Sequence, residues 1–225
     1  MQAKVQPLIL PRYSYRDADH LASASAGTAS RWLSGYTYRD RQGQRVCVAP
    51  IIPGSVKAEG ASFLDLVEVV AIAGLRRAHF TMQDIRQIVA NCQEILGVPR
   101  PLASLDFKVR GQEIFVERGG ALVEVGKRKR MHAWKEFLEP FVNSLDYAID
   151  LELAIRWWPL GRDIPIVVDP DFGFGLPVVA TSGVRTEIIR ERSLAGDLNE
   201  QIASDFNLGL EEVERAIQFE LKLAA

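Results

Sequence analysis

The sequence contains little of what metal chemistry, disulfide scaffolds or membranes require. It has two cysteines and three histidines in 225 residues, and they form no metal-ligand motif such as HExxH. The chain also has no nucleophile motif such as GxSxG. No apolar run approaches the ~20 residues that cross a bilayer, and the N-terminal residues lack the pattern of a signal peptide. We therefore expect a cytoplasmic protein that has no cofactor, no metal and no enzymatic activity.

Charge is distributed unevenly, although the net charge is only −2. Residues 1–60 carry eight basic and four acidic side chains, a balance of +4. Residues 187–225 carry four basic and nine acidic side chains, a balance of −5. A polyanion should therefore bind the N-terminal part and avoid the C-terminal end.

Residues 13–35 predict two short helices joined by a tight turn. Ser14 is followed three residues later by Asp17, a variant of the capping box that begins a helix. The turn, residues 22–26, consists only of alanine and serine, and Gly35 suits the left-handed end of the second helix. This layout is typical of a helix-turn-helix that presents its second helix to the DNA major groove. A plain helical hairpin at the surface is the alternative.

Residues 36–48 predict a β-hairpin directly after these helices, with a turn at Asp40-Arg41-Gln42-Gly43. We name this hairpin the wing, and residues 13–48 together the reading head. A wing would lie along the phosphate backbone beside the recognition helix, whereas a solvated surface hairpin is the alternative. The predicted DNA contacts are Arg16, Thr28, Ser30, Arg31, Tyr36, Tyr38, Arg39, Arg41 and Arg45.

Two longer helices are predicted over residues 62–77 and 81–96. Each begins at a capping pair, Ser62 with Asp65 and Thr81 with Asp84. The first helix is apolar on more than one face and the second on one face, so both should lie beneath the reading head and brace it.

In the middle of the chain, the spacing of the apolar residues changes. Alternation through residues 105–116, around Gly111, predicts a β-hairpin. A helix is predicted over residues 134–145, and two further strands over residues 151–159 and 164–170. We expect a small sheet covered by a helix, which could hold a dimer contact or a ligand pocket.

Three helices are predicted near the C-terminus, over residues 186–195, 199–205 and 210–223. The last two again have the layout of a helix-turn-helix, yet Glu211, Glu212, Glu214 and Glu220 are predicted to point outward. Since non-specific DNA affinity comes mainly from phosphate neutralisation, we expect a protein partner here. The predicted core of this part is Ile188, Ile189, Leu194, Leu198, Ile202, Phe206, Leu208, Val213, Ile217 and Leu221.

Together these patterns predict an α+β fold in three parts. Residues 1–100 would form a winged helix-turn-helix, and residues 101–163 a small β-sheet with a helix. Residues 164–225 would form a three-helix, helix-turn-helix-like domain.

Several separate motifs carry a resemblance to a known family. Residues 164–220 follow the pattern "dP…G.Pvv.gtr" and then "eqIa.df.l..eeVe.Ai.fe", which resembles a small antitoxin domain. The RWLSGY of the reading head and FLDLVEV…LR are similar to VapB-type antitoxins of one mycobacterial group, whose N-terminal helix-turn-helix is MerR-like. The resemblance implies an antitoxin that inhibits a PIN-like ribonuclease toxin and binds operator DNA to regulate its own transcription, as a homodimer or a larger assembly.

The same resemblance suggests where a toxin could be held. PIN-like sites hold Mg²⁺ with carboxylates, so a basic side chain of the antitoxin could occupy the metal position. The candidates are Lys127, Arg128, Lys129, Arg130, Arg156 and Arg162. For the run 127–130, a flexible charged loop is the usual case, and contact with DNA phosphates or with an acidic patch on a partner is the alternative. The alternative function is a MerR-like transcription regulator that responds to a small ligand, and a third is an interaction module without a DNA role.

Overall fold

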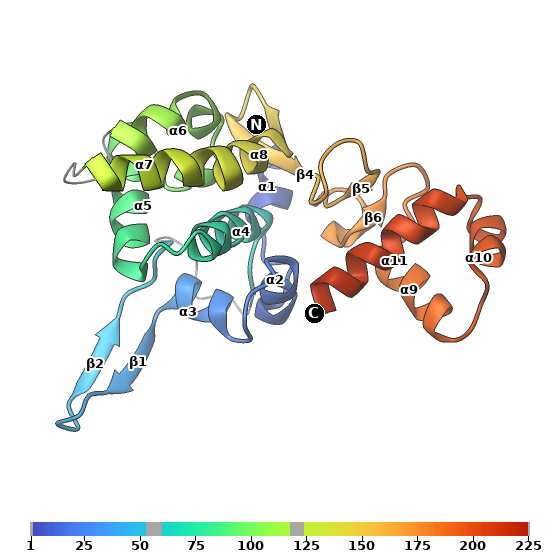
Figure 1. Cartoon of the computed structure of the whole chain (residues 1–225), viewed down its shortest axis with the longest axis horizontal. Helices are drawn as coiled ribbons and strands as arrows, with labels where there is room; N and C mark the ends of the chain where they lie inside the picture. The colour runs from blue at the N-terminus through green and yellow to red at the C-terminus, as the bar shows by residue number, and fades with distance from the viewer. Residues whose placement is uncertain (1, 53–59, 118–123, 225) are drawn as a thin grey trace. The chain divides into compact units, whose positions relative to one another are not determined.

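The computed structural model describes residues 2–52, 60–117 and 124–224 (Figure 1). Tertiary contacts divide the chain into two compact units. Unit 1 comprises Met1–Val142 and Ala148–Ala154, and unit 2 comprises Asn143–Tyr147 and Ile155–Ala225. The section 101–163, which the sequence sets apart as a middle domain, is thus shared between the two units.

Unit 1 is organised around helix α4 (Phe63–Arg77), in which every residue from Phe63 to Leu75 is buried. A helix that is apolar on all sides belongs in a core, and α1, α2, α3 and α5 all pack against it. The other elements of this unit are α1 (Gln2–Ile9), α2 (Tyr15–Leu21), α3 (Thr28–Ser34), β1 (Tyr36–Arg39), β2 (Arg45–Val48), α5 (Met82–Leu96), η1 (Pro101–Ala103), α6 (Leu105–Glu117), α7 (Glu124–Ala133) and η2 (Trp134–Leu138), with α8 (Glu139–Asn143) at its end.

The helix starts predicted at Ser14, Ser62 and Thr81 are confirmed. Helices α2, α4 and α5 each begin at a capping box, in which the cap hydroxyl accepts from a backbone N–H and the aspartate accepts in return. The pairs are Ser14–Asp17, Ser62–Asp65 and Thr81–Asp84.

The hairpin predicted over residues 105–116 is wrong, because these residues form helix α6. Phe107 and Gly111 are one helical turn apart and both buried, whereas Val109 is 72% exposed. A Cβ on Gly111 would lie 2.9 Å from the rings of both Phe107 and Trp134. The glycine that predicted a turn therefore permits the aromatic ring of Trp134 to pack closely on α6.

Helix α4 carries a fully buried carboxyl group at Glu68. Its Oε1 accepts hydrogen bonds from the backbone N–H groups of Leu102 (2.8 Å) and Ala103 (3.3 Å) and so holds η1. Burial raises the pKa of Glu68 from 4.5 to about 8, although Arg100 and the two N–H donors oppose this rise. The carboxyl group is therefore mostly protonated in the folded chain at neutral pH.

Glu68→Gln is expected to stabilise unit 1 relative to the wild type, and more so as the pH rises from about 4.5 to about 8. The folded carboxyl keeps its proton up to about pH 8, whereas the unfolded carboxyl loses it near pH 4.5. Unfolding thus releases a proton in this window, and wild-type stability falls as the pH rises. Urea midpoints of both proteins at the two ends of the window check this; a difference independent of pH would contradict it.

Unit 2 contains short strand pairs and three helices. Strand β5 (Ile166–Val167) pairs antiparallel with β6 (Val178–Val179). Helices α9 (Thr186–Leu194), α10 (Asn199–Phe206) and α11 (Leu210–Ala224) pack on one another. The other elements are β3 (Leu145–Ala148), which pairs with β4 (Leu153–Trp157), and η3 (Gly173–Gly175). Its buried core is Val179, Ile189, Ile202, Ala203, Val213 and Ala216.

The predicted burial of four residues in unit 2 is wrong. Leu194, Leu198 and Leu221, expected in the core, are 68%, 68% and 52% exposed. Glu220, expected to point outward, is buried and accepts a hydrogen bond of 2.5 Å from Thr186 Oγ1. The reason is positional: α9 ends at Leu194, so Leu194 and Leu198 flank the connection to α10. Glu220 lies two turns after Val213, on the buried face of α11.

Candidate nucleic-acid interface

Helices α2 and α3 form the predicted helix-turn-helix, and both pack on α4. Asp19 of α2 is only 5% exposed. Its two carboxylate oxygens accept hydrogen bonds of 2.6 Å from the N–H groups of Gly27 and Ala29. A carboxylate at this place satisfies orphan donors at the start of α3 and favours the positive end of the helix dipole.

Sequence reasoning missed Asp19. The available indication was an acidic residue between Ala18 and Leu21, on the apolar side of a short helix. Such a residue must find buried donors, and the nearest candidates are the N–H groups that begin the next helix.

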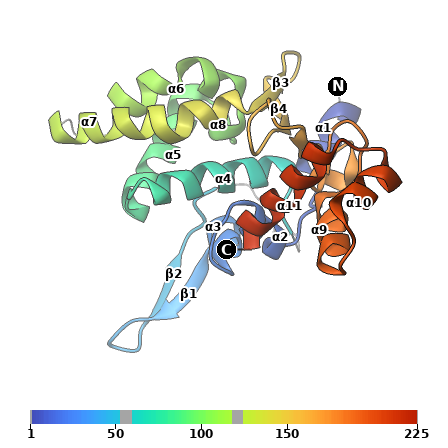
Figure 2. The same ribbon diagram turned by 45° about the vertical axis from the view of Figure 1, so that its right-hand side comes forward.

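Strands β1 and β2 form the predicted wing, which projects away from the helices of unit 1 in both views (Figure 1, Figure 2). Asp40 closes the turn by accepting from the N–H groups of Gln42 (2.9 Å) and Gln44 (2.8 Å). Arg39 lies directly opposite Arg45 in the register. Like charges at such a position destabilise a hairpin, so an anion bound there would stabilise it.

The root of the wing is fixed by helix α5 and helix α3. Arg86 of α5 donates to the carbonyl oxygens of Ala49 (2.6 Å) and Pro50 (3.1 Å). The carbonyl of Trp32 in α3 accepts from the N–H of Ile51 at 2.8 Å. The recognition helix and the wing are thus held to the same core, a role of Arg86 that no local pattern indicates.

The arginines predicted to contact DNA lie at the surface. Arg16, Arg31, Arg39, Arg41 and Arg45 are all exposed. Within the residues that the structure describes, none of the five pairs with a carboxylate. The reading head also contains Asp17, Asp19 and Asp40, so five basic and three acidic groups leave it a net charge of +2, and the unpaired exposed arginines make its surface attractive to a polyanion.

The other predicted contacts differ in accessibility. Tyr36 and Tyr38 are 45% and 48% exposed, and their ring centroids lie 6.2 Å apart. Ser30 is half-buried, and Thr28 is 9% exposed. The Thr28 hydroxyl accepts from Arg31 Nη2 at 3.5 Å, so it orients that guanidinium rather than standing fully open to solvent.

The basic run 127–130 lies in helix α7, so the expectation of a flexible loop is wrong. Lys129 donates to the carbonyl of His79 at 3.0 Å, and its ammonium lies 4.8 Å from the centroid of the Phe80 ring. Arg130 is 7% exposed, whereas Lys127 and Arg128 are exposed. The run therefore contributes to packing in unit 1 as well as to surface charge.

Arg156 and Arg162 lie in unit 2 and share an acidic partner. Arg156 pairs with Asp169 (2.7 Å) and with Asp146 (3.6 Å), and Arg162 pairs with Asp146 (2.6 Å). Either guanidinium would have to exchange these ion pairs before it could enter a metal site of a partner.

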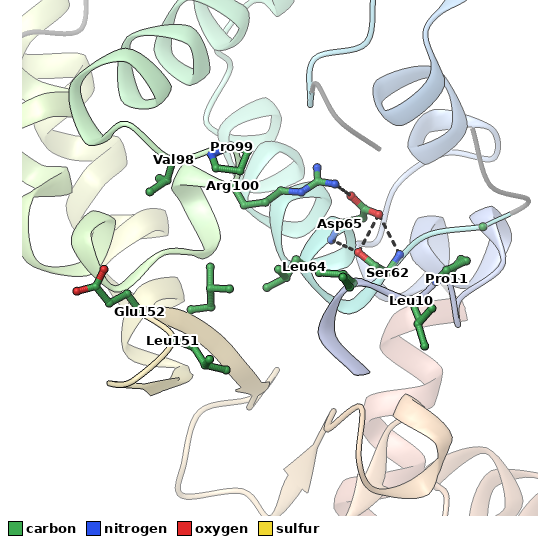
Figure 3. Close-up of a pocket in the computed structure, with 13 residues that line it drawn as sticks. Leu10, Pro11, Ser62, Leu64, Asp65, Val98, Pro99, Arg100, Leu151 and Glu152 are labelled. Atoms are coloured by element: carbon green, nitrogen blue, oxygen red, sulfur yellow. Dashed lines mark hydrogen bonds and ion pairs between the residues drawn. The ribbon is translucent and has the colours of Figure 1, made fainter. Parts of the chain in front are cut away.

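Unit 1 also has an apolar cleft of about 810 Å³, lined mainly by residues 9–11, 98–100 and 151–153 (Figure 3). Arg100 Nη2 reaches Asp65 Oδ1 at 2.7 Å within it. The Nη1 of Arg100 is buried and has no partner among the described residues. The cleft thus combines apolar walls with one unsatisfied donor, which are features of small-molecule sites.

In the described ranges, no three histidine, cysteine, aspartate or glutamate side chains group as metal ligands. No helix in those ranges has the length and apolar character needed to span a bilayer.

Comparison with known proteins agrees with the geometry of the reading head. Residues 11–89 match a family model described as "Putative DNA-binding HTH domain". The N-terminal part is thus similar to helix-turn-helix DNA-binding domains. Residues 166–219 match a family described as "Protein of unknown function (DUF433)".

Two proteins of Mycobacterium tuberculosis are similar over nearly the whole chain. One, named "Putative antitoxin VapB45", is 27% identical over 223 residues, covering 92% of this chain and 93% of that protein. The other, named "Uncharacterized protein Rv2308", is 25% identical, covering 93% and 90%. The crystal structure of Rv2018 from the same organism has a similar fold, with a TM-score of 0.70, 24% identity, and 92% and 98% coverage.

Gly35 sets the path of the chain from α3 into the wing. Its φ is +71°, and a Cβ there would lie 2.4 Å from the carbonyl oxygen of Val48. Gly35→Ala is therefore expected to destabilise unit 1 by about 1–3 kcal/mol, measured by thermal unfolding. Gly43→Ala is the matched control, because Gly43 has a φ of +78° but no atom within 4 Å of the added Cβ. Equal losses in the two variants would contradict the steric argument.

Proposed function

We propose that this protein is the antitoxin of a type II toxin–antitoxin system. It binds operator DNA through the reading head to regulate its own transcription, and it binds and inhibits a PIN-like ribonuclease toxin. The observation that carries the proposal is the set of exposed arginines without carboxylate partners on a helix-turn-helix and its wing. The similarity to a protein named as an antitoxin over nearly the whole chain supports the second activity.

In the DNA complex, α3 enters the major groove in the manner of a MerR-like winged helix. Arg31 and Ser30 face base edges. Arginine can form a bidentate hydrogen bond with guanine, and a serine hydroxyl can hydrogen-bond with several bases. Arg39, Arg41 and Arg45 of the wing contact phosphates, and Arg16 contacts the backbone from α2. A two-fold dimer would place two reading heads on a palindrome.

The toxin is held outside the reading head. Unit 2 exposes Leu194 and Leu198 beside the α9–α10 connection, and Phe174 is 86% exposed with a φ of +59°. Large apolar side chains in solvent commonly mark protein interfaces, and the backbone strain at Phe174 is of the kind that accompanies function. The acidic C-terminal helix complements the basic RNA-binding surface of a nuclease.

The proposal predicts that a neighbouring gene encodes a PIN-like ribonuclease, and co-expression of the two proteins tests it. The two proteins are expected to co-purify, and the chain is expected to suppress RNA cleavage by the partner. Leu194→Asp with Leu198→Asp should weaken the complex, while Arg31→Ala should weaken operator binding alone. Charge reversal at Lys127, Arg128, Lys129, Arg130, Arg156 and Arg162 tests the metal-site mechanism, which unchanged inhibition in every variant would exclude.

The apolar cleft favours a second candidate, a ligand-responsive transcription regulator. A ligand with an apolar body and one acceptor atom would satisfy the Nη1 of Arg100. Small carboxylic acids with apolar chains are suitable probes, and binding should raise the thermal midpoint and change operator affinity. Leu10→Arg, at a cleft residue that is 46% exposed, should abolish both effects; DNA binding that is unaffected by every such probe would remove this candidate.

A further inference from the structure

A second, polar cavity lies in unit 1 beside the turn of the helix-turn-helix. It has a volume of about 370 Å³ and lies between that turn, α3 and the end of α4. The arginine pocket, as we name it, is defined by three hydroxyl residues and three arginines. They are Ser23, Ser25, Thr28, Arg31, Arg76 and Arg77; no acidic residue lines the cavity.

Each arginine of the pocket is held by one neutral bond. Arg77 Nη1 donates to the carbonyl of Ala22 at 2.9 Å, and Arg76 Nη1 donates to the carbonyl of Phe80 at 2.5 Å. Arg31 Nη2 donates to the Thr28 hydroxyl at 3.5 Å. A guanidinium has five N–H donors, so most donors of all three groups stay available after these bonds.

The charges of the pocket are not balanced from within the fold. In the part of the chain that the structure describes, no carboxylate pairs with Arg31, Arg76 or Arg77. Asp19, which precedes the turn, has both oxygens committed to the N–H groups of Gly27 and Ala29. Three like charges around one cavity repel each other, and an anion in the cavity removes that cost.

We propose that the arginine pocket seats one backbone phosphate of the DNA duplex that α3 reads. The guanidinium fork matches the geometry of phosphate oxygens, and the hydroxyls add neutral donors. Arg76 and Arg77 hold this phosphate, and Arg31 keeps donors for a base edge. Because Thr28 of the recognition helix also lines the pocket, a phosphate bound in it fixes the depth of α3 in the groove. This inference rests on the proposed DNA binding and adds Arg76 and Arg77, which lie outside the helix-turn-helix, to the contacts.

The test compares the full-length wild type with Arg76→Gln/Arg77→Gln. Binding to a fluorescein-labelled duplex of arbitrary sequence is measured by anisotropy over a range of salt concentrations. The variant is expected to bind about tenfold more weakly, with a slope of log K against log salt reduced by about 1, as for one lost phosphate contact. The control Arg110→Gln/Lys135→Gln removes two exposed charges on α6 and η2 and should keep the wild-type slope.

The outcomes separate this inference from the proposed function. A wild-type chain that binds no duplex would contradict both. If the wild type binds and Arg76→Gln/Arg77→Gln shows the same slope of log K against log salt, the phosphate seat alone is overturned. Arg76→Gln by itself keeps the bond between Arg77 and Ala22, so it serves as the test if circular dichroism shows that the double variant unfolds. Arg76→Lys/Arg77→Lys should recover the slope but not the full affinity, because lysine lacks the planar fork.

Free phosphorylated ligands have the same chemistry, so a second measurement distinguishes the source. Inorganic phosphate is titrated without DNA at constant ionic strength while the thermal midpoint is followed. We expect phosphate to raise the thermal midpoint of the wild type more than chloride does, but only at concentrations on the order of 1 mM and above, because a seat for one duplex phosphate binds a free anion weakly. Stabilisation that saturates at micromolar phosphate and disappears in Arg76→Gln/Arg77→Gln would overturn the assignment to DNA in favour of a soluble phosphorylated ligand.

Discussion

Replacing Arg39, Arg41 and Arg45 together by glutamine is expected to reduce affinity for duplex DNA on the order of a hundredfold at low salt. The three groups lie on the wing, which projects from the helices of unit 1 (Figure 2). None has a carboxylate partner among the described residues. Each should neutralise one phosphate and release its counterion. The slope of log K against log salt should fall by about 2.7, roughly 0.9 for each contact.

A charge-matched variant separates this local effect from net charge. Arg110→Gln, Lys135→Gln and Lys222→Gln together remove the same charge from exposed positions on α6, η2 and α11. Compared at physiological salt, this control should retain most of the affinity, because screening there limits the reach of a surface charge to about a Debye length, roughly 8 Å. If both triple variants lost affinity equally, the wing would have no special role. The wing variant should also keep its thermal midpoint, since Arg39 and Arg45 repel each other across the hairpin.

Local rules explain why most of unit 1 could be predicted. The capping boxes at Ser14, Ser62 and Thr81 depend on residues three apart, and all three are present. The turn at Asp40 and Gly43 depends on four consecutive residues, and it too is present. Such features follow from nearest neighbours alone, so the helix starts and the wing could be predicted before any tertiary contact was known.

Helix α6 shows where the local rules fail. Its alternating residues fit a strand, and Gly111 fits a turn. The position of Gly111 is decided by the ring of Trp134, which lies 23 residues away in sequence and within 2.9 Å of where a Cβ would stand. A single sequence does not reveal that contact, so periodicity favoured the wrong structure.

The residues of the candidate site also fall into two groups, those that local sequence predicts and those that only tertiary packing brings to the site. The arginines of the wing and of α3 could be predicted because they lie next to recognisable local structure. Arg76 and Arg77 lie at the end of the helix predicted over residues 62–77, and only tertiary packing brings them to the turn after α2. Arg86 is a similar case, since its acceptors lie more than 35 residues away at the root of the wing.

Asp19→Ala is expected to destabilise unit 1 by about 2–4 kcal/mol and to remove most of its DNA affinity. The substitution leaves the N–H groups of Gly27 and Ala29 without their acceptor. The N–H of Ala29, a buried residue, costs about 1–3 kcal/mol when unsatisfied, whereas water can reach the exposed Gly27. The lost cap adds about 1 kcal/mol and frees the first turn of α3. Because that turn carries Thr28 and precedes Arg31, the recognition helix would lose its position even in molecules that stay folded.

Asp17→Ala is the matched control for this prediction, because Asp17 belongs to the capping box of α2 and accepts from Ser14 at an exposed position. It should cost about 1 kcal/mol and leave DNA affinity nearly unchanged. Asp19→Asn keeps one acceptor oxygen and should fall between the two alanine variants. The measurements are urea midpoints and duplex binding at a temperature where all variants are folded. If Asp19→Ala bound DNA as the wild type does, the cap would support stability alone and the orientation of α3 would depend on its packing against α4.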